Sequence, residues 1–406
     1  MISRSIKLPF KKNSVFLFGP RQVGKSMLVR HLLFAEDHIE IDLLKNDILL
    51  KYKANPSQLR AECEFLVKEK MKLFVFIDEI QKCSELLNEV HYLIEKFDKK
   101  IIFILTGSSA RKLKKASVNM LAGRAWQYYL YPFTHVEIGA TFDLDFAITR
   151  GTLPPIIDQS IEDAFRMLRT YVQTYLKEEI LDEAIVRNIG AFSRFLDIAA
   201  DQSGKIVNFS TIARDTAVSS NTVKGYYQIL EDTLIALKLE PYLKSARKRL
   251  TMHPKYYLFD IGVINAINGR ISPSSVKGTN TYGMLFEHFI ILETYRLIHY
   301  AEKPYKIYHW RSSHGAEVDL IIETEDALWA VEIKSNPIVK SGNLTGLKSF
   351  MEDHPKAKPL CVSTCETPYM AGVIPVIPWK HFFRKDFLNI ILSPSSGTIL
   401  EIHPIY

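Results

Sequence analysis

An eight-residue segment, Gly19-Pro-Arg-Gln-Val-Gly-Lys-Ser26, restricts what this chain can fold into more than any other feature. It matches the phosphate-loop pattern GxxxxGK[ST] at every position. It follows an apolar stretch, Val15–Phe18, and opens an amphipathic stretch, Ser26–Phe34. In a strand–loop–helix unit of this kind, backbone N–H groups and the helix N-terminus bind phosphate. The segment predicts a nucleoside-triphosphate site, and the alternative is a chance match to a permissive pattern.

A second apolar stretch, Leu73–Ile77, ends in two acids, Asp78 and Glu79. At the carboxyl tip of a strand Asp78 is expected to hold Mg²⁺ together with the Ser26 hydroxyl, and Glu79 to polarise the attacking water. Lys25 is expected to reach the β- and γ-phosphate oxygens. Adjacent Asp and Glu favour hydrolysis of ATP over binding alone.

A third apolar stretch, Ile101–Leu105, is followed by Thr-Gly-Ser108. Continuous apolar stretches that alternate with helical ones predict a parallel sheet covered on both faces. Ser108 or Ser109 would then lie between the two motifs and sense the γ-phosphate. The residues expected to bind nucleotide are Gly19, Pro20, Arg21, Gln22, Val23, Gly24, Lys25, Ser26, Asp78 and Ser108.

Basic residues follow this third stretch, from Arg111 to Arg124, without an acid between them. One arginine here, with Arg124 as the candidate, would act as a finger on the nucleotide of its own chain or of a neighbouring subunit. The alternative is a solvated basic loop.

The chain resembles the AAA-superfamily ATPases, in particular a bacterial and archaeal group with a largely uncharacterised C-terminal region. The resemblance lies in Gly19-Pro-Arg-Gln, Ile77-Asp-Glu-Ile-Gln, Leu121-Ala-Gly-Arg and Tyr131-Pro-Phe, and it extends over nearly the whole chain. It implies an AAA-type core, ATP and Mg²⁺ as cofactors, and assembly into a ring or dimer. It implies no known cellular role.

The stretch from Phe209 to Leu230 is typical of a helix-turn-helix, with a break rich in turn and cap residues at 215–221. Ser219 or Ser220 would cap the second helix. The shared core would contain Ile212, Ala213, Val218, Val223, Tyr227 and Leu230, and the exposed first turns Asn221, Thr222 and Lys224. Segments 234–239 and 240–250 would form a wing with Lys244, Arg247, Lys248 and Arg249 on DNA phosphates. The alternative is a winged helix that serves only as a protein–protein spacer.

The last third of the chain combines carboxylates with a lysine. Strands at 318–322 and 328–333 would place Asp319 beside Glu332, and Glu332 shares a strand face with Lys334. Two carboxylates with the Ile333 carbonyl suit Mg²⁺ or Mn²⁺, and Lys334 would orient or deprotonate a water.

This pattern resembles the PD-(D/E)xK nuclease fold, with Asp319, Glu332 and Lys334 matching its acid, acid and lysine. Glu287, in Gly283-Met-Leu-Phe-Glu287, matches its helical acid. The sequence lacks the proline before Asp319. The alternative is a nuclease-like fold that no longer cuts.

Composition limits the compartment and partners. The 406 residues carry a net charge of +7, which permits a polyanionic partner, and the apolar runs are too short for a membrane span. Four dispersed cysteines favour reduced thiols and a cytoplasmic protein.

We therefore expect an α/β chain with three parts: an AAA-type P-loop NTPase domain (1–150), a helical region with a winged helix-turn-helix (151–250), and a PD-(D/E)xK nuclease-like domain (251–406). The expected function is ATP hydrolysis with DNA binding and metal-dependent cleavage, in defence or mobile-element control. The alternative is a nucleotide-driven switch with an inactive nuclease-like, partner-binding domain.

Overall fold

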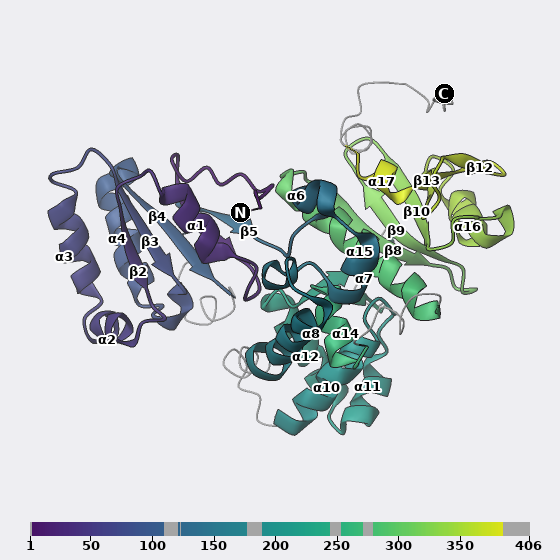
Figure 1. Cartoon of the computed structure of the whole chain (residues 1–406), viewed down its shortest axis with the longest axis horizontal. Helices are drawn as coiled ribbons and strands as arrows, with labels where there is room; N and C mark the ends of the chain where they lie inside the picture. The colour runs from purple at the N-terminus through teal and green to yellow at the C-terminus, as the bar shows by residue number, and fades with distance from the viewer. Residues whose placement is uncertain are drawn as a thin grey trace. The chain divides into compact units, whose positions relative to one another are not determined.

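The computed structural model describes residues 2–108, 121, 123–176, 189–243, 253–270 and 279–384 (Figure 1). Its contacts define two compact units that interleave along the chain. The amino-terminal unit contains Met1–Gly139, Thr152–Ser193 and Asn221–Ala236, and the carboxyl-terminal unit contains Ala140–Gly151, Arg194–Ser220 and Leu237–Tyr406. The three-part division expected from the sequence stays a prediction.

The amino-terminal unit is built on a five-stranded sheet of order β2-β3-β4-β1-β5. All four neighbouring pairs are parallel, which confirms the predicted parallel sheet. The strands are β1 (Ser14–Phe18), β2 (His38–Asp42), β3 (Leu73–Asp78), β4 (Ile101–Gly107) and β5 (Ala125–Tyr129). Because β4 lies between β1 and β3, the end of β4 separates the phosphate loop from the acids after β3.

Helical residues cover this sheet through an apolar face. In α4 (Leu86–Phe97) the buried residues Leu86, Val90 and Leu93 follow a helical spacing, and they join one core with side chains of β3 and β4. This unit also contains α1 (Lys25–Leu33), α2 (Asn46–Ala54), α3 (Ser57–Leu66), α6 (His135–Ile138) and α8 (Ile161–Thr170).

The carboxyl-terminal unit contains a mixed six-stranded sheet of order β12-β13-β11-β10-β9-β8. Its strands are β8 (Lys306–Arg311), β9 (Glu317–Glu323), β10 (Leu328–Lys334), β11 (Lys358–Ser363), β12 (Tyr369–Ala371) and β13 (Ile374–Pro378). Strand β10 pairs with β9 antiparallel and with β11 parallel.

Alternate side chains of these strands enter two separate cores. Leu320, Val331 and Leu360 pack with residues of α15 (Asn280–Tyr300) and α17 (Trp379–Phe382). Ile321 and Ala330 pack instead with α16 (Thr345–Asp353). The period of two along each strand thus gives the sheet one core on each face. Helices α7 (Leu144–Arg150) and α14 (Ile261–Ile267) also belong to this unit.

In sequence, the segment that connects the two sheets is mainly helical, as predicted, and it ends in two short strands. It contains α10 (Ile189–Asp201), α11 (Phe209–Thr216), α12 (Ser220–Asp232), β6 (Ala236–Leu239) and β7 (Lys255–Leu258). A three-residue turn joins α11 to α12, and its first residue, Ala217, has a φ of 56°.

The side chains expected in the helix-turn-helix core are buried, except that Val218 is half-buried. Asn221 and Lys224 are exposed and Thr222 is intermediate, as expected for the first turns of the second helix. The basic wing residues Lys244, Arg247, Lys248 and Arg249 lie outside the described part of the chain.

None of the helices within the described ranges is both long enough and apolar enough to cross a lipid bilayer.

Candidate functional sites

The phosphate loop connects the buried strand β1 to α1. Gly24 precedes α1 with a φ of 91°, a left-handed conformation that glycine adopts without strain. Lys25 is 5% exposed, and its Nζ donates hydrogen bonds to the carbonyls of Gly19 (2.8 Å) and Pro20 (3.0 Å). The lysine therefore lies folded over the loop, with its charge at the place where phosphate is expected.

Gly19 is required by packing as well as by phosphate. A Cβ at this position would lie 2.3 Å from the backbone oxygen of Leu130. Leu130 N in turn donates to Phe18 O over 2.7 Å, so the segment after β5 lies directly against the loop. Any larger residue at position 19 would displace that segment.

Asp78 is the buried acid of the nucleotide site. It is 2% exposed and accepts hydrogen bonds from the hydroxyls of Thr106 and Ser26. Burial raises the pKa of Asp78, and the two hydroxyls oppose that rise. The Ser26 and Asp78 oxygens are thus within hydrogen-bond reach of each other, a pairing that fits a shared Mg²⁺.

Glu79 and Ser108 are connected through a residue to which the sequence assigned no role. Glu79 has a φ of 57°, and its carboxylate accepts a hydrogen bond from the Gln81 side-chain amide. The same Nε2 donates to Ser108 Oγ over 3.1 Å. Ser108 is buried at the end of β4, between the two motifs, where it was expected.

Arg124 lies near the amino-terminal ends of the strands, whereas the phosphate loop lies at their carboxyl-terminal ends. The next residue, Ala125, pairs with Ser14 at the start of β1, whereas the loop follows the end of β1, roughly 13 Å further on. Arg124 forms an ion pair with Glu95. This placement does not support contact with the nucleotide of its own chain and leaves a neighbouring subunit as the alternative. Residues 111–115 lie outside the described ranges.

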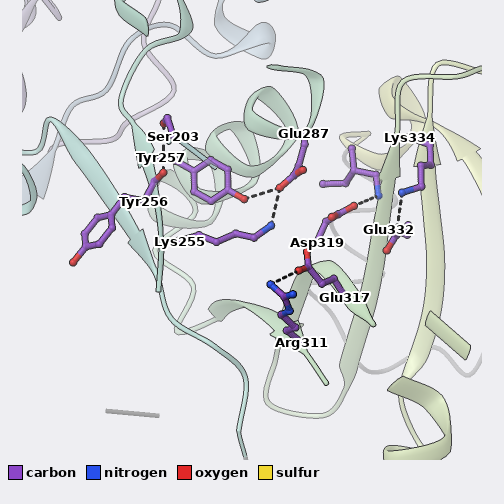
Figure 2. Close-up of polar contacts among 11 residues, drawn as sticks. Ser203, Lys255, Tyr256, Tyr257, Glu287, Arg311, Glu317, Asp319, Glu332 and Lys334 are labelled. Carbon is purple, nitrogen blue, oxygen red and sulfur yellow. Dashed lines mark hydrogen bonds and ion pairs between the residues drawn. The ribbon is translucent and has the colours of Figure 1, made fainter. Parts of the chain in front are cut away.

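The carboxylates of the second site come from neighbouring strands. The β9–β10 register, which ends at Leu320 and Val331, places Asp319 opposite Glu332 at the next step. Asp319 Oδ2 accepts a hydrogen bond from Ile333 N over 2.8 Å, and Lys334 Nζ lies 2.6 Å from Glu332 Oε1 (Figure 2). Asp319, Glu332 and Lys334 are therefore brought together as the spacing predicted.

The electrostatics of this site favour a cation. Glu332 is 6% exposed, and its Oε2 has no hydrogen-bond partner in the part of the chain that the structure describes. Burial raises the pKa of Asp319, and the charges of Glu332 and Glu287 raise it further. A buried carboxylate oxygen without a donor fits a divalent ion. Within the described ranges, however, no three or more His, Cys, Asp or Glu side chains are placed so as to hold a metal ion.

Glu287, the helical acid on α15, is already paired. Its Oε1 accepts from Lys255 Nζ (3.2 Å) and from the Tyr257 hydroxyl (2.8 Å), both on β7 (Figure 2). Neither Lys255 nor Tyr257 belongs to a motif that the sequence displays. They precede the carboxylate motif by more than sixty positions, and no motif spacing marks them.

Comparisons with known proteins divide the chain into three matched regions. Residues 11–139 match the family model of an AAA domain. Residues 141–274 match a domain of unknown function (DUF8612), and residues 282–382 match a second one (DUF4143). The amino-terminal part of the chain is therefore an AAA domain, which supports nucleotide binding and ATPase activity.

Two mycobacterial proteins are similar to most of this chain. An uncharacterized protein of Mycobacterium bovis and one of Mycobacterium tuberculosis are each 25% identical to it over 321 residues. The match covers 79% of this chain and 70% of each relative.

Proposed function

We propose that this chain is an ATPase whose carboxyl-terminal unit binds DNA and cleaves it with the help of Mg²⁺ or Mn²⁺. The proposal of DNA cleavage rests on Asp319 and Glu332, which face each other on neighbouring strands with Lys334 beside them. It also rests on Glu332 Oε2, which has no hydrogen-bond partner among the described residues. The AAA domain supports the ATPase half.

In the nucleotide site each side chain has a separate task. Lys25 would exchange its bonds to the loop carbonyls for the β- and γ-phosphate oxygens, and Ser26 with Asp78 would hold Mg²⁺. Glu79, fixed by Gln81, would orient the attacking water. Ser108 would contact the γ-phosphate, and its hydrogen bond with Gln81 would connect that contact to the turn after β3.

In the carboxylate site Asp319, Glu332 and the Ile333 carbonyl would hold a divalent ion. When bound, such an ion neutralises charge on the scissile phosphate and lowers the pKa of a bound water. Lys334 would orient the attacking water through its ammonium group, since it lies on the same strand face as Glu332 and forms an ion pair with it. The resemblance to PD-(D/E)xK nucleases supports these roles.

The order of elements around the helix-turn-helix supports DNA binding. A bridge at Ile206 pairs antiparallel with Lys255 of β7, and α11, α12, β6 and β7 follow that bridge in sequence. This is the order of a winged helix. Asn221 and Lys224 present polar side chains at the start of its second helix.

A second function is favoured by the ion pairs of the carboxylate site. Lys334 with Glu332 and Lys255 with Glu287 neutralise two of the three carboxylates without any metal. In that case the unit would bind a partner without cutting, and the protein would be a nucleotide-driven switch.

Plasmid cleavage with Mg²⁺ or Mn²⁺, with and without ATP, tests the proposal. Glu332→Gln should abolish cleavage and leave ATP turnover unchanged, since Glu332 belongs to the carboxyl-terminal unit. The matched control is Glu317→Gln on the neighbouring strand β9, a carboxylate paired with Arg311 over 3.0 Å, and it should cut as wild type. Lys25→Ala should abolish ATP turnover.

Two results would reject the cleavage half. The first is no cutting by the wild type under any metal condition while ATP is hydrolysed, and this result favours the switch. The second is equal cutting by wild type and Glu332→Gln, which would place any nuclease activity elsewhere or in a contaminant.

A further inference from the structure

We propose that Lys255 is a positioning residue of the carboxylate site, and that it keeps Glu287 off the metal so that Asp319 and Glu332 alone supply the side-chain ligands. This inference rests on the proposed metal site. It assigns to β7, in the region matched by one domain of unknown function, a part in a site whose ligands come from the other.

Lys255 and Tyr257 act on one oxygen. Two positions apart on β7, they point to the same side of the strand, and both donate to Glu287 Oε1. Lys255 is 5% exposed and Tyr257 is fully buried. Figure 2 shows Lys255 reaching from β7 toward Glu287, with Asp319 beyond it on β9. Glu287 thus has two buried donors on one of its two carboxylate oxygens.

The lysine stays charged in this buried position. Burial lowers the pKa of Lys255, but the carboxylates of Glu287 and Asp319 raise it by more, and the net shift is upward. With every group ionised, the carboxylates of Asp319, Glu332 and Glu287 together with Lys255 and Lys334 carry a net charge of −1. One divalent ion would bring that charge to +1, and a second would bring it to +3. A buried charge of +3 is costly, so the cluster does not suit two ions.

Hydrogen bonds to residues 203–207 hold the backbone on both sides of Lys255 in place. Val207 N donates to Pro254 O over 2.9 Å, and Gly204 N donates to Tyr256 O over 2.7 Å. Ser203 Oγ accepts from Leu258 N over 2.9 Å. Because the residues on both sides of Lys255 are hydrogen-bonded, the backbone holds its ammonium group in a defined position.

The inference predicts how Mn²⁺ affinity responds when the ion pair is altered. Lys255→Met leaves the half-buried Glu287 carboxylate without its counter-charge and with Tyr257 as a remaining donor, so Mn²⁺ should bind at least about tenfold tighter than to wild type. The double variant Lys255→Met/Glu287→Gln removes a neutral pair, so it should bind Mn²⁺ within about threefold of wild type. Tyr257→Phe, which keeps the pair, should also stay within about threefold.

The experiment is calorimetric titration of the full chain with Mn²⁺, without ATP or nucleic acid, with melting temperatures to verify folding. Loss of affinity by the double variant would show that Glu287 is a ligand in the wild type and would overturn the inference. Unchanged affinity in a folded Lys255→Met would overturn it as well. If Lys255→Met does not fold, the Mn²⁺ affinity of the double variant, which preserves the buried charge balance, still shows whether Glu287 is a ligand.

Asp319→Asn separates failure of this inference from failure of the proposed function. In the wild-type background it should remove Mn²⁺ binding. If Mn²⁺ binds equally with Asn at 319, the proposed metal site is wrong and the role of Lys255 falls with it. If Asp319→Asn removes Mn²⁺ binding but Lys255→Met leaves the affinity unchanged, only the role of Lys255 is wrong.

Discussion

Gln81 Nε2 donates a hydrogen bond to Ser108 Oγ over 3.1 Å, and through it the turn after β3 is fixed to the end of β4. The same amide also donates to Glu79. A Cβ at Gly107, the residue before Ser108, would lie 2.8 Å from Gln81 Oε1, so a side chain there would displace the amide. One amide therefore connects Glu79, the acid expected to polarise the attacking water, to the residue expected to sense the γ-phosphate.

Gln81→Ala should impair hydrolysis much more than binding. Without the amide Glu79 loses the donor that holds its carboxylate, so kcat for ATP should fall by about 10- to 100-fold. Nucleotide affinity should remain within about threefold, because the phosphate loop is untouched. Steady-state ATPase assays and titration with a fluorescent ATP analogue measure the two quantities.

The control for that variant is Gln127→Ala, an exposed glutamine on β5, which should change neither quantity. An equal loss of affinity and turnover in Gln81→Ala would contradict the assigned role, since it would indicate damage to the loop itself.

Arg124→Ala should lower ATP turnover only when chains associate. Arg124 lies beside the start of β1 and is paired with Glu95, so a role on nucleotide requires a neighbouring subunit. Wild-type turnover per chain should rise with protein concentration, and Arg124→Ala should remove the rise. Arg60→Ala, another exposed arginine paired with a glutamate, serves as control. A loss of turnover in dilute, monomeric protein would contradict this role.

Local patterns in the sequence predicted the parallel strands and the acids at their ends. Val15–Phe18 and Leu73–Ile77 are continuous apolar stretches, and their burial follows from that composition. The positions of Asp319 and Glu332 were also predictable, since a hairpin joins their strands. Arg124 was not, because its distance from the phosphate loop depends on the placement of β5 beside β1, which no local pattern encodes.

Lys255 and Tyr257 were beyond local reasoning for a different reason. The site receives them from a strand whose place is set by hydrogen bonds to residues 203–207 and by α15, both far away in sequence. A Lys-x-Tyr pair on a strand is unremarkable by itself. Its role becomes visible only when Glu287 is seen to accept from both side chains.

Gly262→Ala should destabilise the carboxyl-terminal unit by about 2–4 kcal/mol, because α14 begins against the end of α7. A Cβ at Gly262 would lie 2.0 Å from the backbone oxygen of Arg150, so α7 would have to shift. Gly342→Ala in the same unit is the control, since no atom lies within 4 Å of its Cβ position. Urea unfolding measures both variants, and equal stabilities would contradict the tight crossing.

Acid should weaken the same unit through His288. This residue is 1% exposed, and its Nε2 lies 2.7 Å from Leu258 O. Burial lowers the pKa of His288 from 6.5 to about 4. Between those values the unfolded chain binds a proton that the folded chain does not, so the free energy of unfolding decreases as the pH falls from 6.5 toward 4. The loss between pH 7 and 5 should be about 2 kcal/mol.

Replacement of His288 by a residue that cannot titrate isolates this contribution. His288→Gln keeps an amide donor for Leu258 O, so its unfolding free energy should fall less than that of wild type over the same pH interval. Urea unfolding at pH 7 and 5, followed by tryptophan fluorescence, measures the difference, since Trp310, Trp329 and Trp379 all belong to this unit. His309 is also buried, and its pKa is lowered to about 3, so the variant should retain part of the acid sensitivity. An identical pH dependence in wild type and His288→Gln would show that His288 titrates equally in the folded and unfolded chain.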